Sequence, residues 1–162
     1  MALETISTLF SALGTAANTA KAFRELLANK RGETRLLLEE LKKNSTLSWL
    51  VVNREVEPPK VIPQLSTKAY DRLLEQGYNF NDLVPSRKRL VRGDSRFEDS
   101  DLASFIGKDV ANLVEGIYDR IKEMQVIFQV DPGNERIDYN RRVINLHKRI
   151  LLLMFHLRGW AA

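Results

Sequence analysis

The chain has 162 residues, the size of a single domain that can bury a core without disulfides or metals. Its composition, 44% hydrophobic and 28% charged, is typical of a globular protein and excludes a wholly disordered chain. The absence of cysteine excludes thiolate zinc sites, and the net charge of +4 permits an anionic partner without requiring one.

These bounds favour one domain over residues 1–162, with no cofactor, no metal site and a cytoplasmic location. No stretch reaches the roughly 20 apolar residues of a membrane-spanning helix. The N-terminal MALETIST has an acid where a secretory signal would carry basic residues.

The first predicted helix covers residues 5–28. Apolar residues recur at helical spacing, at Ile6, Leu9, Phe10, Leu13, Ala17, Ala20, Phe23 and Leu27. Residues 5–20 carry no charge, and a small neutral face around Ala17 is typical of a helix that packs closely on another helix. The basic residues that follow, at Lys21, Arg24, Lys30 and Arg31, leave a membrane-surface segment as the alternative.

Gly32 ends that helix, and a second is predicted from Glu33 to about Asn53. We expect it to bury Leu37, Leu38, Leu41, Leu47 and Leu50 and to expose Glu39, Glu40, Lys42 and Lys43. Residues 56–66 contain three prolines, so we expect a stiff, non-helical connector that packs across the bundle through Val61, Ile62 and Leu65. A short third helix is capped by Ser66 and ends at Gly77.

Residues 78–96 are predicted to be a loop with a strong basic run at Arg87, Lys88, Arg89, Arg92 and Arg96. These cations are candidates for anion binding, because each nucleic-acid phosphate they neutralise would add affinity. The acids Glu98, Asp99 and Asp101 follow at once, so pairing within the chain and an acidic protein partner are the alternatives.

The fourth predicted helix runs from about Asp101 to Phe128. Its apolar stripe contains Leu102, Phe105, Ile106, Val110, Leu113, Ile117, Ile121, Met124 and Phe128. The carboxylates Glu115, Asp119 and Glu123, with basic neighbours at Arg120 and Lys122, are expected to be solvated. The turn Asp131-Pro132-Gly133-Asn134 returns the chain antiparallel into the last helix.

That last helix, residues 139–160, has two distinct faces. The predicted core stripe contains Val143, Leu146, Ile150, Met154 and Leu157, and His147 lies about 40° from Val143 at its edge. The opposite face carries Arg142, Arg149, Leu152 and His156 and should be an interaction surface, together with Ala17, because aliphatic residues on it need a cover. The cover is either the first helix or a second copy of the chain.

The same helix carries pairs of arginine and histidine. Four residues separate Arg142 from His147, and six separate Arg149 from His156. This pattern resembles the motif of the HEPN family, helical proteins that commonly cleave RNA without metal and as dimers. The resemblance implies a histidine as general acid or base and an arginine that stabilises charge on the phosphate.

The sequence therefore predicts an all-α fold, an antiparallel bundle of four or five helices with a proline-rich connector. Our leading functional hypothesis is a non-catalytic assembly or adaptor module that binds a protein partner or forms a homo-oligomer. In general character the chain resembles small accessory proteins of bacterial defence or toxin loci. The alternatives are a HEPN-like ribonuclease, with RNA as partner, and a membrane-active effector that acts through the first helix.

Overall fold

A computed structural model describes residues 16–93 and 101–159 of the chain, with side chains from residue 19 onward. Its helices are α2 (Ala16–Ala28), α3 (Gly32–Arg54), the single turn α4 (Pro58–Val61), α5 (Lys68–Glu75), α6 (Val110–Val130) and α7 (Tyr139–Arg158). Over these ranges the only extended pairing is an isolated bridge between Leu90 and Asp109. The predicted all-α fold is confirmed.

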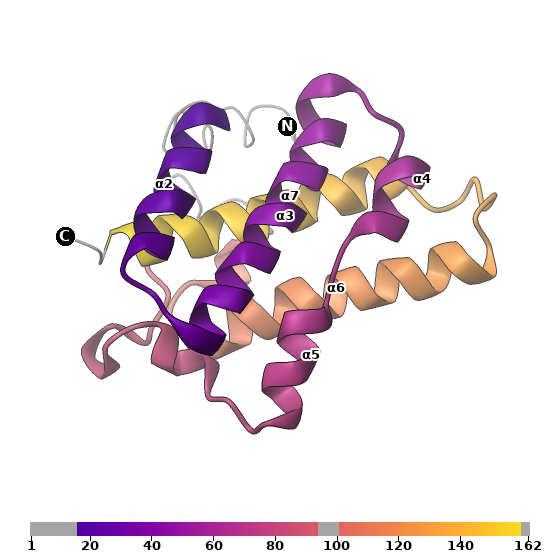
Figure 1. Cartoon of the computed structure of the whole chain (residues 1–162). Coiled ribbons are helices and arrows are strands. Elements are labelled where there is room, and N and C mark those ends of the chain that lie inside the picture. Colours follow the sequence, from indigo (N-terminus) through magenta and orange to yellow (C-terminus); the bar gives the residue numbers. More distant parts are fainter. Residues whose placement is uncertain (1–15, 94–100, 160–162) are drawn as a thin grey trace.

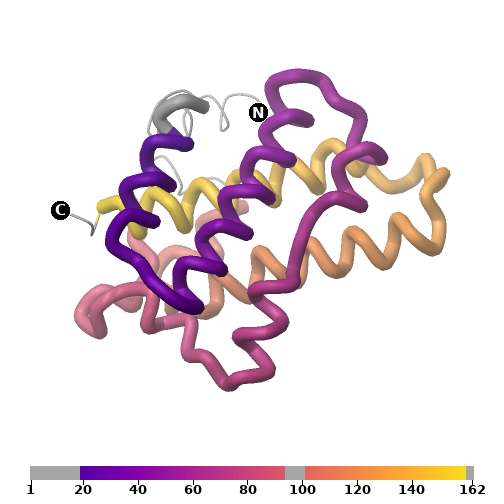
Figure 2. Tube along the Cα trace, in the orientation of Figure 1, coloured from indigo at the N-terminus to yellow at the C-terminus, as the bar shows by residue number. Residues whose placement is uncertain are grey.

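Two helical hairpins cross one another in this fold (Figure 1). One consists of α2 and α3, joined at Gly32, whose φ of 60° lies in the left-handed region that glycine adopts readily. The other consists of α6 and α7, which run antiparallel across the middle of the chain trace, with α7 (yellow) above α6 (orange) (Figure 2). Helix α7 packs against α2, α3, α4 and α6, so it is the central helix.

The sequence of α7 accounts for that central position. The predicted core stripe is confirmed, with all five of its residues buried. The run from Ile150 to Met154 is also buried on every side, with no side chain more than 1% exposed. A helix that is apolar all round needs neighbours all round. Leu152, predicted to need a cover from the first helix or a second copy, is fully buried within the chain, so it is not part of an accessible interaction surface.

The predicted connector does pack across the bundle, since Val61, Ile62 and Leu65 are buried. It is nevertheless partly helical, because Pro58 and Pro59 occupy the first turn of α4, where the missing N–H groups would have no helical partner. The amide of Gln125 on α6 donates hydrogen bonds to the carbonyls of Ile62 and Leu65, at 3.1 and 2.9 Å, and holds the connector in place.

The start of α6 differs from the prediction. The helix begins at Val110, because the preceding residues bond to another part of the chain: Val91 N–H donates to the Lys108 carbonyl, and Val110 N–H to the Arg89 carbonyl, both at 2.7 Å. Gly107, with φ of 79°, provides the turn. The loop at residues 89–91 therefore forms hydrogen bonds with backbone groups that would bond within the helix if α6 began earlier.

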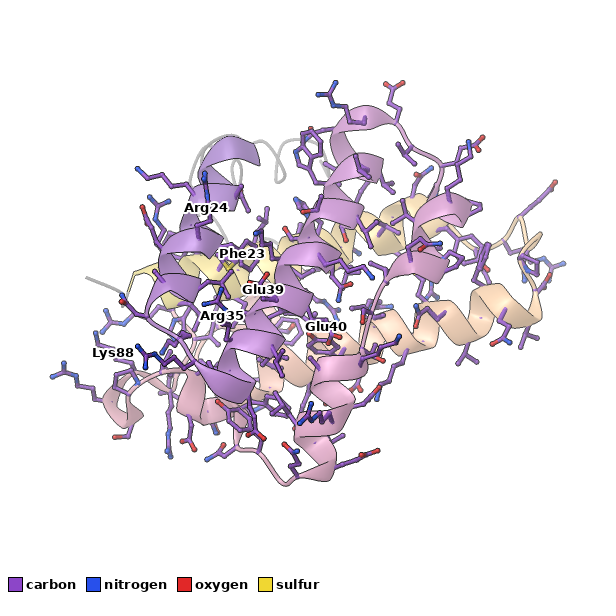
Figure 3. The ribbon with its side chains drawn as sticks, viewed as in Figure 1. Phe23, Arg24, Arg35, Glu39, Glu40 and Lys88 are labelled. Atoms are coloured by element: carbon purple, nitrogen blue, oxygen red, sulfur yellow. The ribbon has the colours of Figure 1, made fainter. Side chains whose placement is uncertain are left out.

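The prediction that Glu40 is solvated is wrong. Its side chain is only 8% exposed and points from α3 towards the start of α5. Its carboxylate accepts hydrogen bonds from the Ser66 hydroxyl at 2.7 Å, from Ala69 N–H at 2.8 Å and from Tyr70 N–H at 3.1 Å. Helix α5 is therefore capped by a residue of another helix. Figure 3 labels Glu40 beside its neighbour Glu39, which is not part of this contact.

The predicted first helix is confirmed only over α2. The positions of Ile6, Leu9, Phe10 and Leu13 lie outside the described residues. So does the side chain of Ala17, which was assigned to the interaction surface, and so do Arg96, Glu98 and Asp99.

Candidate functional site

The first arginine–histidine pair of α7 is divided between two sides of the helix. Five positions on a helix correspond to a rotation of about 140°. Arg142 Nη1 lies 3.3 Å from a carboxylate oxygen of Glu123 on α6. His147 is only 2% exposed and lies at the hollow between α2 and α3, where burial lowers its pKa from 6.5 to about 4. The two side chains therefore do not share an accessible cleft within one chain.

The second pair lies on one face, as predicted, but both members contact the chain itself. Arg149 Nη1 donates to the Gly116 carbonyl at 2.8 Å. His156 Nδ1 accepts the N–H of Arg92 at 3.1 Å, so the ring proton is on Nε2, which donates to the Lys88 carbonyl at 3.0 Å. Burial lowers the pKa of His156 below its ordinary value, so the neutral ring fixes the basic loop onto α7.

This arrangement corrects the interaction surface that the sequence predicted on α7. His156 is 2% exposed, and Arg142 and Arg149 are only partly exposed, each in contact with α6. For Arg142, Arg149 and His156 the cover is α6 and the loop at residues 88–92. The first helix, predicted as one possible cover, packs on α7 as well, through α2.

The basic run of the loop is fixed at several points. Arg87 and Arg92 are exposed, while Lys88 and Arg89 are partly buried. A guanidinium nitrogen of Arg89 lies 3.3 Å from a carboxylate oxygen of Asp82. The run therefore presents cations on a fixed backbone, and anion binding by it stays a prediction.

A concave apolar site lies between α2 and α3 in the described part of the chain, and we call it the α2–α3 groove. Its deepest part is a hollow of about 200 Å³. Its lining comes from three helices: Thr19, Ala20 and Phe23 of α2; Lys42, Ser45, Thr46 and Trp49 of α3; and His147 of α7. Figure 3 labels Phe23 in the space between α2 and α3.

The groove continues along α3. A shallower hollow of about 300 Å³ shares Lys42 and Thr46 with the deep one and extends past Lys43 and Leu47 to Glu39. From residue 39 to residue 49 the helix rises about 15 Å. The site is therefore elongated along α3. It has an apolar hollow between helices at one end and, at the other, an open surface of α3 that carries Glu39, Lys42 and Lys43.

The floor also contains buried polar groups. Thr19 Oγ1 is shielded from water and has no hydrogen-bond partner among the described residues, and Ser45 is 3% exposed. In an apolar pocket, a few polar groups of this kind can hydrogen-bond a bound molecule and so fix its orientation. Sequence reasoning missed this site because its lining residues are of ordinary type and come from segments far apart in the chain.

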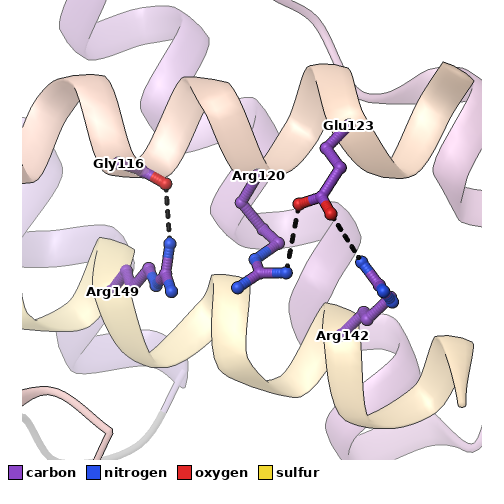
Figure 4. Close-up of polar contacts among 5 residues, drawn as sticks. All are labelled: Gly116, Arg120, Glu123, Arg142 and Arg149. Carbon is purple, nitrogen blue, oxygen red and sulfur yellow. Dashed lines mark hydrogen bonds and ion pairs between the residues drawn. The ribbon is translucent and has the colours of Figure 1, made fainter.

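A second site lies where α6 faces α7 (Figure 4). The carboxylate of Glu123 is 3.2 Å from Arg120 Nη1 and 3.3 Å from Arg142 Nη1. Arg149 lies about two turns beyond Arg142 on α7. Its guanidinium carbon is 5.0 Å from the centre of the Phe105 ring. We call Arg120, Arg142 and Arg149 the arginine cluster. Glu123 is exposed to solvent, as expected, and it also links the two helices through Arg120 and Arg142.

Comparison with known proteins gives no match: no protein-family model, no curated protein and no solved structure is significantly similar to this chain. The resemblance to HEPN proteins therefore stays a hypothesis. Within the described ranges no three metal-binding side chains lie together. Over those same residues, no helix combines the length and the apolar character needed to cross a membrane.

Proposed function

We propose that the protein is a non-catalytic helical adaptor that binds an amphipathic helix of a partner protein in the α2–α3 groove. The observation that supports this proposal is the groove itself, an apolar hollow between α2 and α3 that continues along the surface of α3. Binding of one apolar helix face in a groove between helices is a recurrent mode of peptide recognition.

The dimensions of the groove suit such a partner. A length of about 15 Å corresponds to roughly three turns of helix, which present apolar residues at spacings of three and four. The deep hollow of about 200 Å³ beside Phe23 and Trp49 fits one large apolar side chain as an anchor.

The charges at the rim specify the partner further. Lys42 lines both hollows and Lys43 lines the outer one, whereas the acid there, Glu39, already lies 3.7 Å from Arg35. An acidic residue beside the apolar anchor of the partner would complement these lysines and favour encounter in the right orientation. The partner we propose is therefore an acidic amphipathic helix with one large apolar anchor.

The positions of the two histidines give the ribonuclease alternative less support than the groove gives the adaptor. His147 forms part of the groove floor, and His156 fixes the loop through both ring nitrogens. A general acid or base must reach the proton that it transfers. Each histidine is 2% exposed in the described chain, so the adaptor is the function that the geometry favours.

Photo-crosslinking tests the proposal. A benzophenone amino acid replaces Thr46 in the groove or, as a control, Gln129 on the exposed side of α6, and the full chain is expressed in its natural host. We expect one discrete adduct from position 46 and none from 129. The crosslinked segment should be an acidic amphipathic helix, and Ala20→Trp, which fills the groove, should abolish the adduct.

The partner segment can then be tested as a synthetic peptide. Truncating its apolar anchor to Ala should weaken binding about 30-fold, since burying one large aliphatic side chain contributes about 2 kcal/mol. An adduct that persists in Ala20→Trp, or equal adducts at positions 46 and 129, would refute groove binding. An adduct made of two copies of this chain would replace the adaptor with a homo-oligomer.

A further inference from the structure

The arginine cluster has a net positive charge, because fewer acids than arginines lie around it among the described residues. Arg120, Arg142 and Arg149 converge on the interface of α6 and α7, and Glu123 is the one carboxylate that pairs with them there. The nearest other acid, Asp101, is 3.3 Å from Lys148 Nζ and so already has a cation. Asp101 also acts on Arg149, so the three arginines and Lys148 face two acids, Glu123 and Asp101, and two positive charges are in excess among the described residues.

Unused donors of the cluster face the gap between Arg120 and Arg149. Arg149 uses Nη1 on the Gly116 carbonyl, and Arg120 uses Nη1 on Glu123. The Nε atom of each is buried and has no hydrogen-bond partner among the described residues. The side chain of Arg120 is 25% exposed, so a small solute can reach this gap from water.

Close packing keeps the two guanidiniums together despite their charge. Gly116 has no side chain, and a Cβ there would lie only 2.8 Å from the Phe105 ring that stacks on Arg149. Burial, and then the charge of Arg120, lower the pKa of Arg149. An anion in the gap would relieve the repulsion between the two cations.

We propose that the arginine cluster binds a phosphate dianion, free or as the monoester group of a small molecule, between Arg120 and Arg149. Glu123 demonstrates that an oxyanion fits between two of these arginines. A dianion matches the two unbalanced charges, and the planar fork of arginine matches the oxygens of phosphate. This site is distinct from the α2–α3 groove and does not depend on the proposed adaptor function.

Calorimetric titration of the full chain tests the site. The ligands are inorganic phosphate, adenosine 5′-monophosphate and adenosine, at constant ionic strength. We expect phosphate and the monophosphate to bind and adenosine not to bind. Equal affinity for phosphate and the monophosphate would indicate a site for free phosphate, and tighter binding of the monophosphate would indicate a monoester ligand.

Variants distinguish the cluster from general basic charge. Arg120→Gln should weaken phosphate binding at least tenfold, because a charge-assisted hydrogen bond and a unit charge are lost. Arg141→Gln, on the exposed side of α7, removes the same charge outside the cluster and should leave binding within twofold. Glu123→Gln should tighten binding several-fold, a gain that loss of structure would not produce.

Three results would overturn the proposal. The first is an absence of phosphate binding at millimolar concentration to the folded wild-type chain. The second is an equal effect of Arg120→Gln and Arg141→Gln. The third is that adenosine binds as well as its monophosphate, since the base would then be the recognised group.

Discussion

Replacing Glu40 should destabilise the protein far more than replacing its neighbour Glu39. The carboxylate of Glu40 is 8% exposed and accepts three hydrogen bonds, two of them from N–H groups in the first turn of α5. A helix has no internal partners for those N–H groups, so Glu40→Ala leaves them unsatisfied beside the core.

The size of the effect can be worked out from these contacts. Hydrogen bonds to a charged group contribute about 1.5–3 kcal/mol each, but three that share one carboxylate are not additive. Loss of a helix cap typically costs about 1 kcal/mol. We therefore expect Glu40→Ala to lower the free energy of unfolding by about 3 kcal/mol, equivalent to a Tm lower by roughly 6–12 °C in a chain of this size.

Glu40→Gln should have an intermediate effect. One carboxylate oxygen accepts from both Ser66 and Ala69, and the other accepts from Tyr70 N–H. An amide keeps one acceptor and replaces the other with a donor, which cannot bond to an N–H group. About half of the loss seen in Glu40→Ala is expected.

The assay is urea unfolding followed by circular dichroism, with Glu39→Ala as the matched control. Glu39 is 44% exposed and lies 3.7 Å from Arg35, so its loss should cost less than 0.5 kcal/mol. Hydrogen exchange should also accelerate at the amides of Ala69 and Tyr70 in Glu40→Ala. If Glu40→Ala and Glu39→Ala have the same unfolding midpoint, the cap does not stabilise α5 and this reasoning fails.

Three further predictions concern stability and protonation. Burial lowers the pKa of His147 from 6.5 to about 4, so the folded state holds the ring neutral. The free energy of unfolding therefore has its full value above pH 6.5 and falls as the pH drops towards 4, by up to about 3 kcal/mol. His147→Gln should show a correspondingly flatter pH profile of unfolding free energy, and parallel profiles would contradict the assignment. Gln125→Ala should cost about 1–2 kcal/mol in urea unfolding, because two connector carbonyls lose their donor, whereas Gln129→Ala on the exposed side of α6 should cost almost nothing; equal losses would exclude a role for the Gln125 bonds. Nitrogen NMR of His156 at neutral pH should show the proton on Nε2, and a proton on Nδ1 would be incompatible with the bond from Arg92 N–H.

Local patterns in the sequence predicted most of the helices. Apolar residues at a spacing of three and four identified α3 and the core stripe of α7, and Gly32 and the turn after Asp131 marked their boundaries correctly. These features depend on residues within a few positions of one another. They are therefore present in the sequence whatever the rest of the chain does.

The contacts that make the sites depend on residues far apart in the chain. Glu40 was expected to be solvated like its neighbours, but it caps a helix that begins 28 positions later at Lys68. His156 bonds to a loop 64 and 68 positions earlier, and this loop covers a face for which the sequence predicted the first helix or a second copy of the chain as the cover. Periodicity shows that a face of α7 must be covered, but not by which segment.

The sequence by itself thus determined the helical class and the burial of the core stripe of α7. It also showed that a second face of α7, which carries basic and aliphatic side chains, needs a cover. Only the tertiary structure decided that α6 and the basic loop cover that side, and that the described parts of α2 and α3 form a groove beside His147. The physical reason is that helical periodicity is set by local backbone geometry, whereas pairing between faces is set by packing and charge across the whole chain.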